Sequence, residues 1–260
     1  MFLRRSSSPV STAESRDRDY ARQYNADFVS RWDELIDWDK RAAGESGFFN
    51  DLLLKAGVCR VLDVSTGSGF HAVQLRKAGF NVTACDGSPT MVERARANFI
   101  KHDVDIPLLC SDWHDLEPRQ LGTFDAVLCL GSSLCHVFDE DERIAVLKGF
   151  RRLLRPGGLM LVDQRNFQAI LEGRFSSSGQ YYYCGKTAKV TLGELHDSLC
   201  EFVYSFADGA VYRLRVFPVR PRQLRSELMS AGFVVDKSYG DFKCIYDPMR
   251  ADFIIHQAHV

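Results

Sequence analysis

The sequence lacks an excess of charge of either sign: 33 Lys and Arg residues stand against 34 Asp and Glu residues, a formal net charge of −1. Proteins that grip nucleic acid through its phosphates usually carry a clear positive excess, so no nucleic-acid partner is expected. Long apolar runs are lacking too, and those such as Val127–Leu130 and Leu159–Val162 fall far short of the ~20 residues that a membrane helix needs. With 45% hydrophobic residues among 260, the chain can still bury a full core, so we expect a globular protein without a membrane partner.

The eight cysteines lack the Cys-x-x-Cys spacing of zinc and redox sites, and the seven histidines are scattered along the chain. Most of the cysteines, for example Cys85, Cys110 and Cys129, lie within apolar runs. Buried free thiols are typical of proteins from a reducing compartment. We therefore expect a cytoplasmic protein with free, mostly buried thiols and without a metal site.

Residues 1–19 contain no apolar segment, which excludes a secretory signal. They are rich in Ser and Arg, and Arg4 and Arg5 precede the first acidic residue, Glu14, as in an organelle transit peptide. A disordered tail over residues 1–19 is the simpler interpretation, and it is the one that we expect.

The first half of the remaining chain has the pattern of an α/β protein. Apolar residues recur at spacings of three and four from Asp19 to Leu54, which predicts helices. Helices are also predicted over His71–Ala78, from Ser88-Pro89 and from about Asp139. Between them, short β-branched runs predict strands at Arg60–Ser65, Asn81–Asp86, Ile106–Cys110, Phe124–Cys129 and Gly158–Asp163. This alternation predicts a doubly wound, mostly parallel, Rossmann-like sheet, with ligands along the edge where the strands end.

After Asp163 the pattern changes to antiparallel strands. These are predicted at Tyr181–Cys184, Leu199–Ala207 and Val211–Val219, with Asp208-Gly209 as a hairpin turn. A helix over Arg222–Ala231 and strands at Phe233–Tyr239 and Phe253–His259 close the chain and bring the main sheet to seven strands. We expect one domain over residues 20–260. It comprises a helical cap (20–57), a cofactor-binding core (58–166), an antiparallel substrate or lid insertion (167–220), and the closing helix and strands (221–260).

A glycine turn marks the expected ligand site. Asp63-Val-Ser-Thr-Gly67-Ser-Gly69 joins a strand to a helix, where glycines let the backbone approach a ligand and the helix offers free N–H groups. Asp86 ends the next strand, where a carboxylate can bridge the two hydroxyls of a ribose. The combination predicts a nucleoside cofactor.

A dinucleotide cofactor is the weaker choice. Dinucleotide fingerprints usually have a third glycine after the first two, whereas here Gly69 is followed by Phe70 and no third glycine comes next. With Asp63, Ser111-Asp-Trp113 and Leu154-Arg-Pro-Gly-Gly158, the chain instead resembles the class I S-adenosylmethionine-dependent methyltransferases. In that family the glycine turn faces the methionine part, the acid after strand two holds the ribose, and the residues after strand three flank the adenine. The cofactor residues that we expect are Tyr24, Trp32, Arg41, Asp63, Ser65, Gly67, Gly69, Asp86, Gly87, Met91, Asp112, Trp113, Leu130 and His136.

Five stretches narrow the resemblance to the glycine and glycine/sarcosine N-methyltransferases. They are Arg31–Asp39, Cys129–Ser133, Asp163–Asn166, Tyr181–Gly185 and Tyr239–Phe242. The resemblance implies methylation of glycine to sarcosine and of sarcosine to N,N-dimethylglycine, the first steps of glycine betaine synthesis, with S-adenosylhomocysteine as product. It also implies that Tyr24 approaches the sulfonium and that Arg41 reaches the cofactor carboxylate. One departure concerns the substrate, because Ser132 stands where the family has Asn.

Arg165 is the main candidate for binding a small amino acid. It lies just past a predicted buried strand, where a guanidinium fork can clamp a carboxylate. Asn166 beside it is predicted either to hold the ligand or to cap the chain reversal. The resemblance adds Tyr183, Tyr204 and Ser132 to this catalytic set.

Several alternatives stay open. An N-methyltransferase for another small amino acid or amine would share every cofactor feature, and Ser132 is its best support. A non-catalytic S-adenosylmethionine-binding protein would keep the cofactor site without the Arg165–Tyr183 stretch that is present here. A nicotinamide oxidoreductase lacks its third glycine, and a nucleic-acid methylase lacks the Asn/Asp-Pro-Pro-aromatic motif after strand four.

Overall fold

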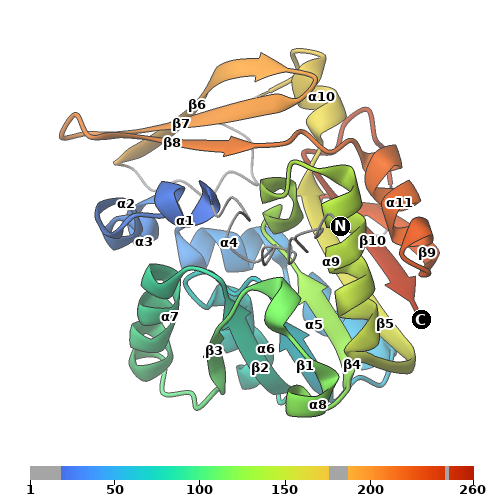
Figure 1. The fold of residues 1–260 in the computed structure, drawn as a ribbon. Helices are drawn as coiled ribbons and strands as arrows, with labels where there is room; N and C mark the ends of the chain where they lie inside the picture. The colour runs from blue at the N-terminus through green and yellow to red at the C-terminus, as the bar shows by residue number, and fades with distance from the viewer. Residues whose placement is uncertain (1–18, 176–186, 244–245) are drawn as a thin grey trace, which may run out of the picture.

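The computed structural model describes residues 19–175, 187–243 and 246–260, and their main feature is a seven-stranded sheet of order β3-β2-β1-β4-β5-β10-β9 (Figure 1). The strands β1 to β5 are parallel to one another, and β10 runs antiparallel to both β5 and β9. Their bounds are β1 Arg60–Asp63, β2 Asn81–Asp86, β3 Leu108–Cys110, β4 Phe124–Cys129, β5 Leu154–Arg165, β9 Val234–Gly240 and β10 Phe253–His259. The predicted doubly wound sheet is confirmed.

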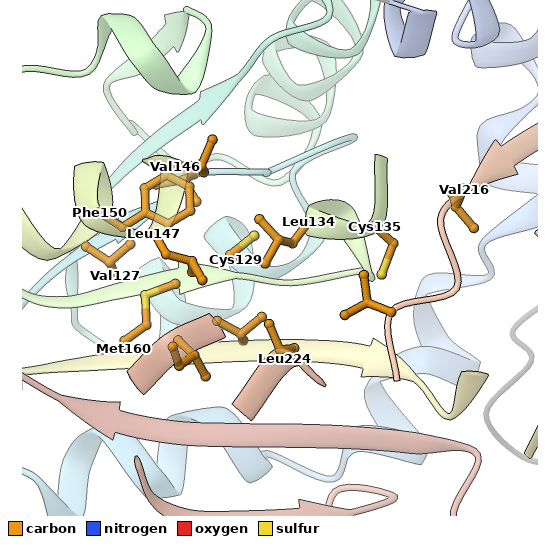
Figure 2. Close-up of a cluster of buried hydrophobic side chains, with 14 of the residues drawn as sticks. Val127, Cys129, Leu134, Cys135, Val146, Leu147, Phe150, Met160, Val216 and Leu224 are labelled. Carbon is orange, nitrogen blue, oxygen red and sulfur yellow. The ribbon is translucent and has the colours of Figure 1, made fainter. Parts of the chain in front are cut away.

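Helices cover both faces of this sheet, which explains why most residues of its central strands β1 and β4 are buried on either side. Alternate residues of β4 divide between two buried clusters, with Val127 in one and Leu128 in the other. In Figure 2, Val127 and Met160 of the sheet pack against Phe150 and Leu224 of the helices. The helices on that face are α9 (Glu140–Arg152) and α11 (Pro221–Ser230), and those on the other are α5 (Phe48–Lys55), α6 (Phe70–Lys77) and α7 (Pro89–Lys101).

The N-terminal helical pattern is divided into short helices rather than one long one. They are α1 Asp19–Gln23, α2 Ala26–Ser30, α3 Trp32–Leu35 and α4 Trp38–Glu45, followed by α5. Asn25 and Asp37 have extended backbones, and each side chain caps a new helix by accepting an N–H, from Phe28 and Lys40 respectively. Short polar side chains compete with helix continuation in this way, so the periodicity persists while the helix restarts.

A second sheet of three antiparallel strands lies at the top of Figure 1, beyond the helices α1–α4. It consists of β6 (Ala188–His196), β7 (Leu199–Phe206) and β8 (Val211–Val216). The hairpin at Asp208-Gly209 is confirmed, with Gly209 at φ 90°. The prediction missed β6, in which Val190 is the sole fully buried residue and the apolar signal is correspondingly weak. The predicted strand Tyr181–Cys184 lies outside the described residues.

The N-terminal helices are tied to this second sheet by side chains. The Gln23 amide accepts from the Arg215 N–H (2.5 Å) and donates to the Arg215 carbonyl (3.3 Å). It therefore supplies hydrogen-bond partners to backbone groups on the exposed edge of β8. Arg31 forms an ion pair with Asp208 at the hairpin turn (2.7 Å). These contacts make α1–α3 and the β6–β8 sheet one continuous cover over the strand ends.

Smaller elements complete the description. Short helices not predicted from the sequence are η1 Trp113–Asp115, α8 Pro118–Leu121, η2 Ser133–His136 and α10 Phe167–Leu171. Of the cysteines that the structure describes, Cys85, Cys129, Cys135 and Cys200 are buried, whereas Cys59 and Cys110 are exposed. Cys110 was expected to be buried, but it ends β3, which forms an edge of the sheet. No helix within the described ranges is long and apolar enough to cross a membrane.

A buried ion pair joins α9 to α11 and carries a stability prediction. Arg143 and Glu227 have side-chain exposures of 0% and 1%, with Nη2 and Oε1 2.7 Å apart, and Arg143 also donates to the Val137 and Phe138 carbonyls.

Replacing Arg143 with Met leaves a buried carboxylate without its partner, so we expect the free energy of unfolding to fall by about 3–5 kcal/mol. The measurement is urea denaturation at pH 7. Arg155→Met serves as a control, because Arg155 is 46% exposed and its ion pair with Asp125 is expected to contribute ~1 kcal/mol or less. Equal losses in the two variants would contradict the assignment.

Candidate functional site

A cavity of about 760 Å³ lies along the carboxyl ends of β1, β2 and β4, beneath the N-terminal helices. It falls within the size range of sites for small molecules and cofactors. The sequence-predicted residues that line it are Tyr24, Trp32, Arg41, Ser65, Gly67, Asp86, Gly87, Met91, Asp112, Trp113, Leu130 and His136. Asp63 and Gly69 belong to the same glycine turn but stand outside the lining.

The glycine turn adopts a conformation that requires glycine. Gly67 and Gly69 have φ angles of 54° and 92°, and a Cβ on Gly69 would lie 2.6 Å from the ring of Phe99 on α7. Left-handed backbone and close helix packing therefore both select glycine at position 69. The Gly67 N–H donates to the Asp86 carboxylate (2.8 Å), which fixes the turn against the end of β2.

Asp86 is held in place by the backbone and faces the cavity. Its Oδ2 accepts from Gly67 and its Oδ1 accepts from the Ser88 N–H (2.9 Å). Burial raises the pKa of Asp86 to about 6, although both backbone hydrogen bonds oppose this shift. Each carboxylate oxygen keeps a further lone pair, so the group can accept hydrogen bonds from two vicinal hydroxyls.

The far end of the cavity, next to β3, has a fixed aromatic wall. The Trp113 Nε1–H donates to the Val64 carbonyl (2.6 Å), and Asp112 caps the short helix η1 through the His114 N–H. Tyr20 of α1 closes over this end, and a Cβ on Gly87 would overlap its hydroxyl. Tyr20 was not predicted to lie in the site, since nothing in the chain near position 20 marks it as a neighbour of β2.

Tyr24 and His136 form a neutral pair at the other end of the cavity. The Tyr24 hydroxyl lies 3.0 Å from Nε2 of His136, and both side chains are half-buried in the cavity wall. Burial lowers the pKa of His136 to about 4 and raises the pKa of Tyr24 well above its usual value. Near pH 7 the pair therefore adds no charge, and the rings of Tyr24 and Trp32, 5.5 Å apart, give the wall an aromatic surface.

A second cavity of about 130 Å³ shares this wall. Tyr24, Trp32, Arg41, Gly131 and His136 line both cavities, and the smaller one adds Ser132, Arg165, Tyr204, Phe167, Val190, Phe202, Leu214, Val216, Leu35, Ile36, Phe242 and Phe253. The inner face of the β6–β8 sheet supplies much of the apolar lining. Among the described residues, no Asp or Glu side chain lines this smaller cavity.

Arg165 and Ser132 are fixed relative to each other at the end of β5. The Ser132 hydroxyl accepts the Arg165 N–H (2.9 Å), and the Ser132 N–H donates to Asp163 (2.8 Å), so the loop after β4 is tied to β5. The Arg165 guanidinium lies 4.7 Å from the centre of the Phe253 ring and 5.6 Å from that of Phe202. Aromatic faces stabilise such a cation while leaving its hydrogen-bond edges in plane for a ligand.

Two other candidates of the catalytic set have different positions. Asn166 is buried, donates to the Pro248 and Ala251 carbonyls, and caps α10 by accepting the Ala169 N–H. All of these contacts stabilise the chain reversal, which is the second of the two roles predicted for Asn166. The residue lies outside the lining of both cavities. Tyr183 lies outside the described residues.

His71 and Gly131 also line the larger cavity and were missed. His71 occupies the first turn of α6, directly after the glycine turn, so its place in the sequence could have revealed it. Gly131 follows β4 and has a φ of 80°. Its neighbour Ser132 has a φ of 61°, a conformation that costs energy for residues other than glycine and that the bond to Asp163 helps to hold.

Comparisons with known proteins agree with this geometry. Residues 61–158 match the family described as "Methyltransferase domain". The chain is 42% identical over 244 residues to a glycine/sarcosine N-methyltransferase from Halorhodospira halochloris, covering 94% of this chain and 91% of the relative. It is 41% identical over 246 residues to a glycine/sarcosine N-methyltransferase from Aphanothece halophytica, covering 94% and 93%. The solved structure of an S-adenosylmethionine-dependent methyltransferase from Clostridium acetobutylicum matches with a TM-score of 0.72 at 16% identity, over 90% of this chain and 98% of that one, which speaks for the fold alone.

Proposed function

The chain belongs to the glycine/sarcosine N-methyltransferase family, and we propose that it transfers methyl groups from S-adenosylmethionine to the nitrogen of glycine and then of sarcosine. The product would be N,N-dimethylglycine, as in the first steps of glycine betaine synthesis. The observation that carries the proposal is the pair of joined cavities. A cavity of cofactor size shares the Tyr24–His136 wall with one large enough only for a small molecule, and that one contains Arg165.

The residues of the larger cavity fit S-adenosylmethionine. Asp86 suits the ribose hydroxyls, and Trp113 and Tyr20 suit the adenine. Asp63 is buried behind the glycine turn and accepts the Ser65 N–H (3.3 Å), so it would support the turn that meets the methionine part. When bound, the cofactor supplies a methyl group made electrophilic by its sulfonium.

We assign carboxylate binding in the smaller cavity to Arg165. A guanidinium fork can hold a carboxylate through two hydrogen bonds and fix its plane. Ser132 and Tyr204 add hydroxyl groups beside it, and the apolar lining from the β6–β8 sheet excludes water from the remaining surface. An acceptor clamped in this way would direct its amino group toward the wall that both cavities share.

The chain would accelerate methyl transfer mainly by placement. Holding two reactants in line can lower a barrier by ~7–11 kcal/mol. The attacking amine must be neutral, and a cavity without Asp or Glu side chains among its described lining does not favour the ammonium form. The neutral Tyr24–His136 pair likewise adds no charge at the point of transfer.

This assignment also divides the chain by task. Residues 58–166 would hold the cofactor, residues 20–57 and 167–220 would cover it and shape the acceptor cavity, and residues 221–260 would complete the sheet. The cover of α1–α3 and β6–β8 supports this division, because its inner face lines the smaller cavity.

Titration calorimetry with S-adenosylmethionine, followed by a methyl-transfer assay, tests the proposal. Glycine and sarcosine are expected to be methylated, and N,N-dimethylglycine is expected to remain unchanged. Transfer to neither glycine nor sarcosine by a protein that binds the cofactor would overturn the proposed acceptor.

A second candidate acceptor, another small amino acid or amine, is favoured by one observation. The Ser132 hydroxyl is engaged by the Arg165 N–H, so it offers a single hydrogen to a ligand, whereas an Asn amide carries two. If this difference has redirected the enzyme, wild-type protein fails to methylate glycine and Ser132→Asn gains that activity. If glycine is the natural acceptor, the variant changes kcat/KM for glycine only severalfold.

A further inference from the structure

A tight turn directly after β9 holds a phenylalanine in an unfavourable backbone conformation. The Gly240 carbonyl accepts the Lys243 N–H (3.0 Å), and the two residues between them, Asp241 and Phe242, have φ angles of 52° and 57°. Positive φ at both central positions is the pattern of a type I′ turn, which favours glycine or asparagine there. A bulky residue at such an angle is strained. The reason for phenylalanine at position 242 therefore lies in what its side chain contacts.

Asp241 fixes this turn to the start of β10. Its backbone N–H donates to the Phe253 carbonyl (3.0 Å), and its Oδ1 accepts the N–H groups of Asp252 (2.8 Å) and Phe253 (3.0 Å). Three hydrogen bonds from one residue hold a conformation that the backbone alone would not favour. The same segment reaches the acceptor arginine, because Phe253 is the partner of Arg165 in the β5–β10 ladder.

The Phe242 side chain is buried and lines the smaller cavity together with Phe253. Of the buried apolar residues described in this lining, these two alone belong to the cluster on the α5–α7 face of the main sheet. Others, such as Phe202 and Leu214, belong to the cluster that includes the inner face of the β6–β8 sheet. The two phenylalanines, with ring centres 5.7 Å apart, thus form the side of the cavity that faces the core.

The ring of Phe242 is supported from behind by α5. Its centre lies 6.0 Å from that of Phe48 and 5.8 Å from that of Phe49, and both of these side chains are buried. Close-packed rings yield little space to a neighbour. Phe242 therefore acts as a fixed wall that a larger ligand cannot push aside.

The shape of an amino acid indicates which of its atoms meets this wall. With the carboxylate on Arg165, whose guanidinium lies 4.7 Å from the centre of the Phe253 ring, Cα lies one bond further into the cavity. The nitrogen points to the wall shared with the larger cavity, and Phe242 is not part of that wall. A substituent on Cα would therefore meet Phe242, whereas a methyl group on the nitrogen would not.

We propose that Phe242 limits the acceptor to α-amino acids without a side chain on Cα, and that Asp241 is the positioning residue that holds the ring in the cavity. This inference rests on the proposed function and adds the class of acceptor that the cavity rejects. Alanine is the smallest member of that class. One methyl group in an apolar site typically changes kcat/KM by about 10–200-fold, so the effect is large enough to measure.

Phe242→Gly tests the wall, because it removes the ring and suits the positive φ of the turn. Methyl transfer is measured with glycine, sarcosine, and L- and D-alanine. The ratio of kcat/KM for alanine to that for glycine is expected to rise about tenfold or more for at least one enantiomer. The ratio for sarcosine to glycine should change less than threefold, and the Kd of S-adenosylmethionine less than twofold.

Phe80→Ala is the matched control. Phe80 is a buried member of the same cluster, but it precedes β2 at the amino end of the sheet and lines neither cavity. Its loss removes a comparable ring from the core, so the free energy of unfolding should fall while both acceptor ratios stay at the wild-type values.

Asp241 is tested by a pair of variants. Asp241→Ala removes the Oδ1 acceptor and is expected to raise the alanine-to-glycine ratio severalfold. Asp241→Asn keeps an Oδ1 acceptor and tolerates positive φ, so it should restore the wild-type ratio. A residue that only stabilised the fold would lower the activity on every acceptor alike.

An alanine-to-glycine ratio that is unchanged in Phe242→Gly, or a sarcosine ratio that rises as much, would overturn the inference. If that variant does not fold, Phe242→Leu gives the same comparison, with a severalfold gain expected. A wild-type protein that binds S-adenosylmethionine but methylates neither glycine nor sarcosine would refute the proposed function and this inference with it. Normal glycine activity with unchanged selectivity in the variants would overturn the inference alone.

Discussion

Replacing Arg165 with alanine is expected to raise the KM for glycine by about two orders of magnitude or more, while the Kd of S-adenosylmethionine changes less than threefold. The guanidinium would supply two charge-assisted hydrogen bonds to the carboxylate, each with a contribution of about 1.5–3 kcal/mol. It belongs to the smaller cavity alone, whereas Asp86, Trp113 and most of the other expected cofactor residues line the larger one. The measurement is a steady-state assay with glycine as the varied substrate, paired with calorimetric titration of the cofactor.

Arg165→Lys separates geometry from charge. A lysine keeps the positive charge but loses the planar fork, so its KM for glycine should fall between those of the wild type and the alanine variant. The Phe253 and Phe202 rings that flank the guanidinium also suit a planar cation better than an ammonium. A proportional loss of cofactor binding and glycine binding in the alanine variant would show that Arg165 supports the fold instead of the acceptor.

Local sequence signals predicted much of the main sheet and its first helices well. The bounds of β2, β4 and β10 are those expected, and Ser88-Pro89 begins α7 as a hydroxyl cap followed by proline. Such features depend on a few neighbouring residues, as does the glycine turn. Once the order of strands is known, the rule that ligands bind at strand carboxyl ends brings the turn and Asp86 together without further information.

The unpredicted features depend on contacts between distant parts of the chain. Tyr20 meets Gly87, and Glu45 meets His71, through the docking of N-terminal helices on the core. Two roles were open for Asn166, holding the ligand or capping the chain reversal. The second is favoured by its bonds to the Pro248 and Ala251 carbonyls, which only the folded chain brings beside it. Tertiary partners of this kind leave no periodic or local trace in a single sequence.

The size of the acceptor cavity is another property that only the folded chain reveals. Its lining combines the ends of β4 and β5 with residues from three strands of the separate β6–β8 sheet. The sequence predicted an arginine and aromatic residues near the acceptor, but it gave no measure of space. The observed 130 Å³ favours a small amino acid over a larger amine.

Asp86 carries the second large effect, and its variant Asp86→Ala is expected to raise the Kd of S-adenosylmethionine about a hundredfold or more. The change removes the acceptor for the ribose hydroxyls and leaves the Gly67 and Ser88 N–H groups without the carboxylate that orients them. The KM for glycine at saturating cofactor should stay within severalfold of the wild-type value. The measurement is a calorimetric titration of S-adenosylmethionine at pH 8. The unfolding midpoint of the apoprotein checks that the variant is folded.

The same carboxylate predicts how cofactor affinity depends on pH. Burial raises the pKa of Asp86 to about 6, and the ionised form is the better acceptor for ribose hydroxyls. Cofactor affinity should therefore be constant above pH 7 and fall as the pH drops through 6, approaching tenfold per pH unit below it. In Asp86→Asn, which cannot ionise, that dependence should disappear while the affinity at pH 8 is reduced. A wild-type affinity unchanged from pH 5 to 8, or an Asn variant that keeps the full pH dependence, would place the ribose contact on another group.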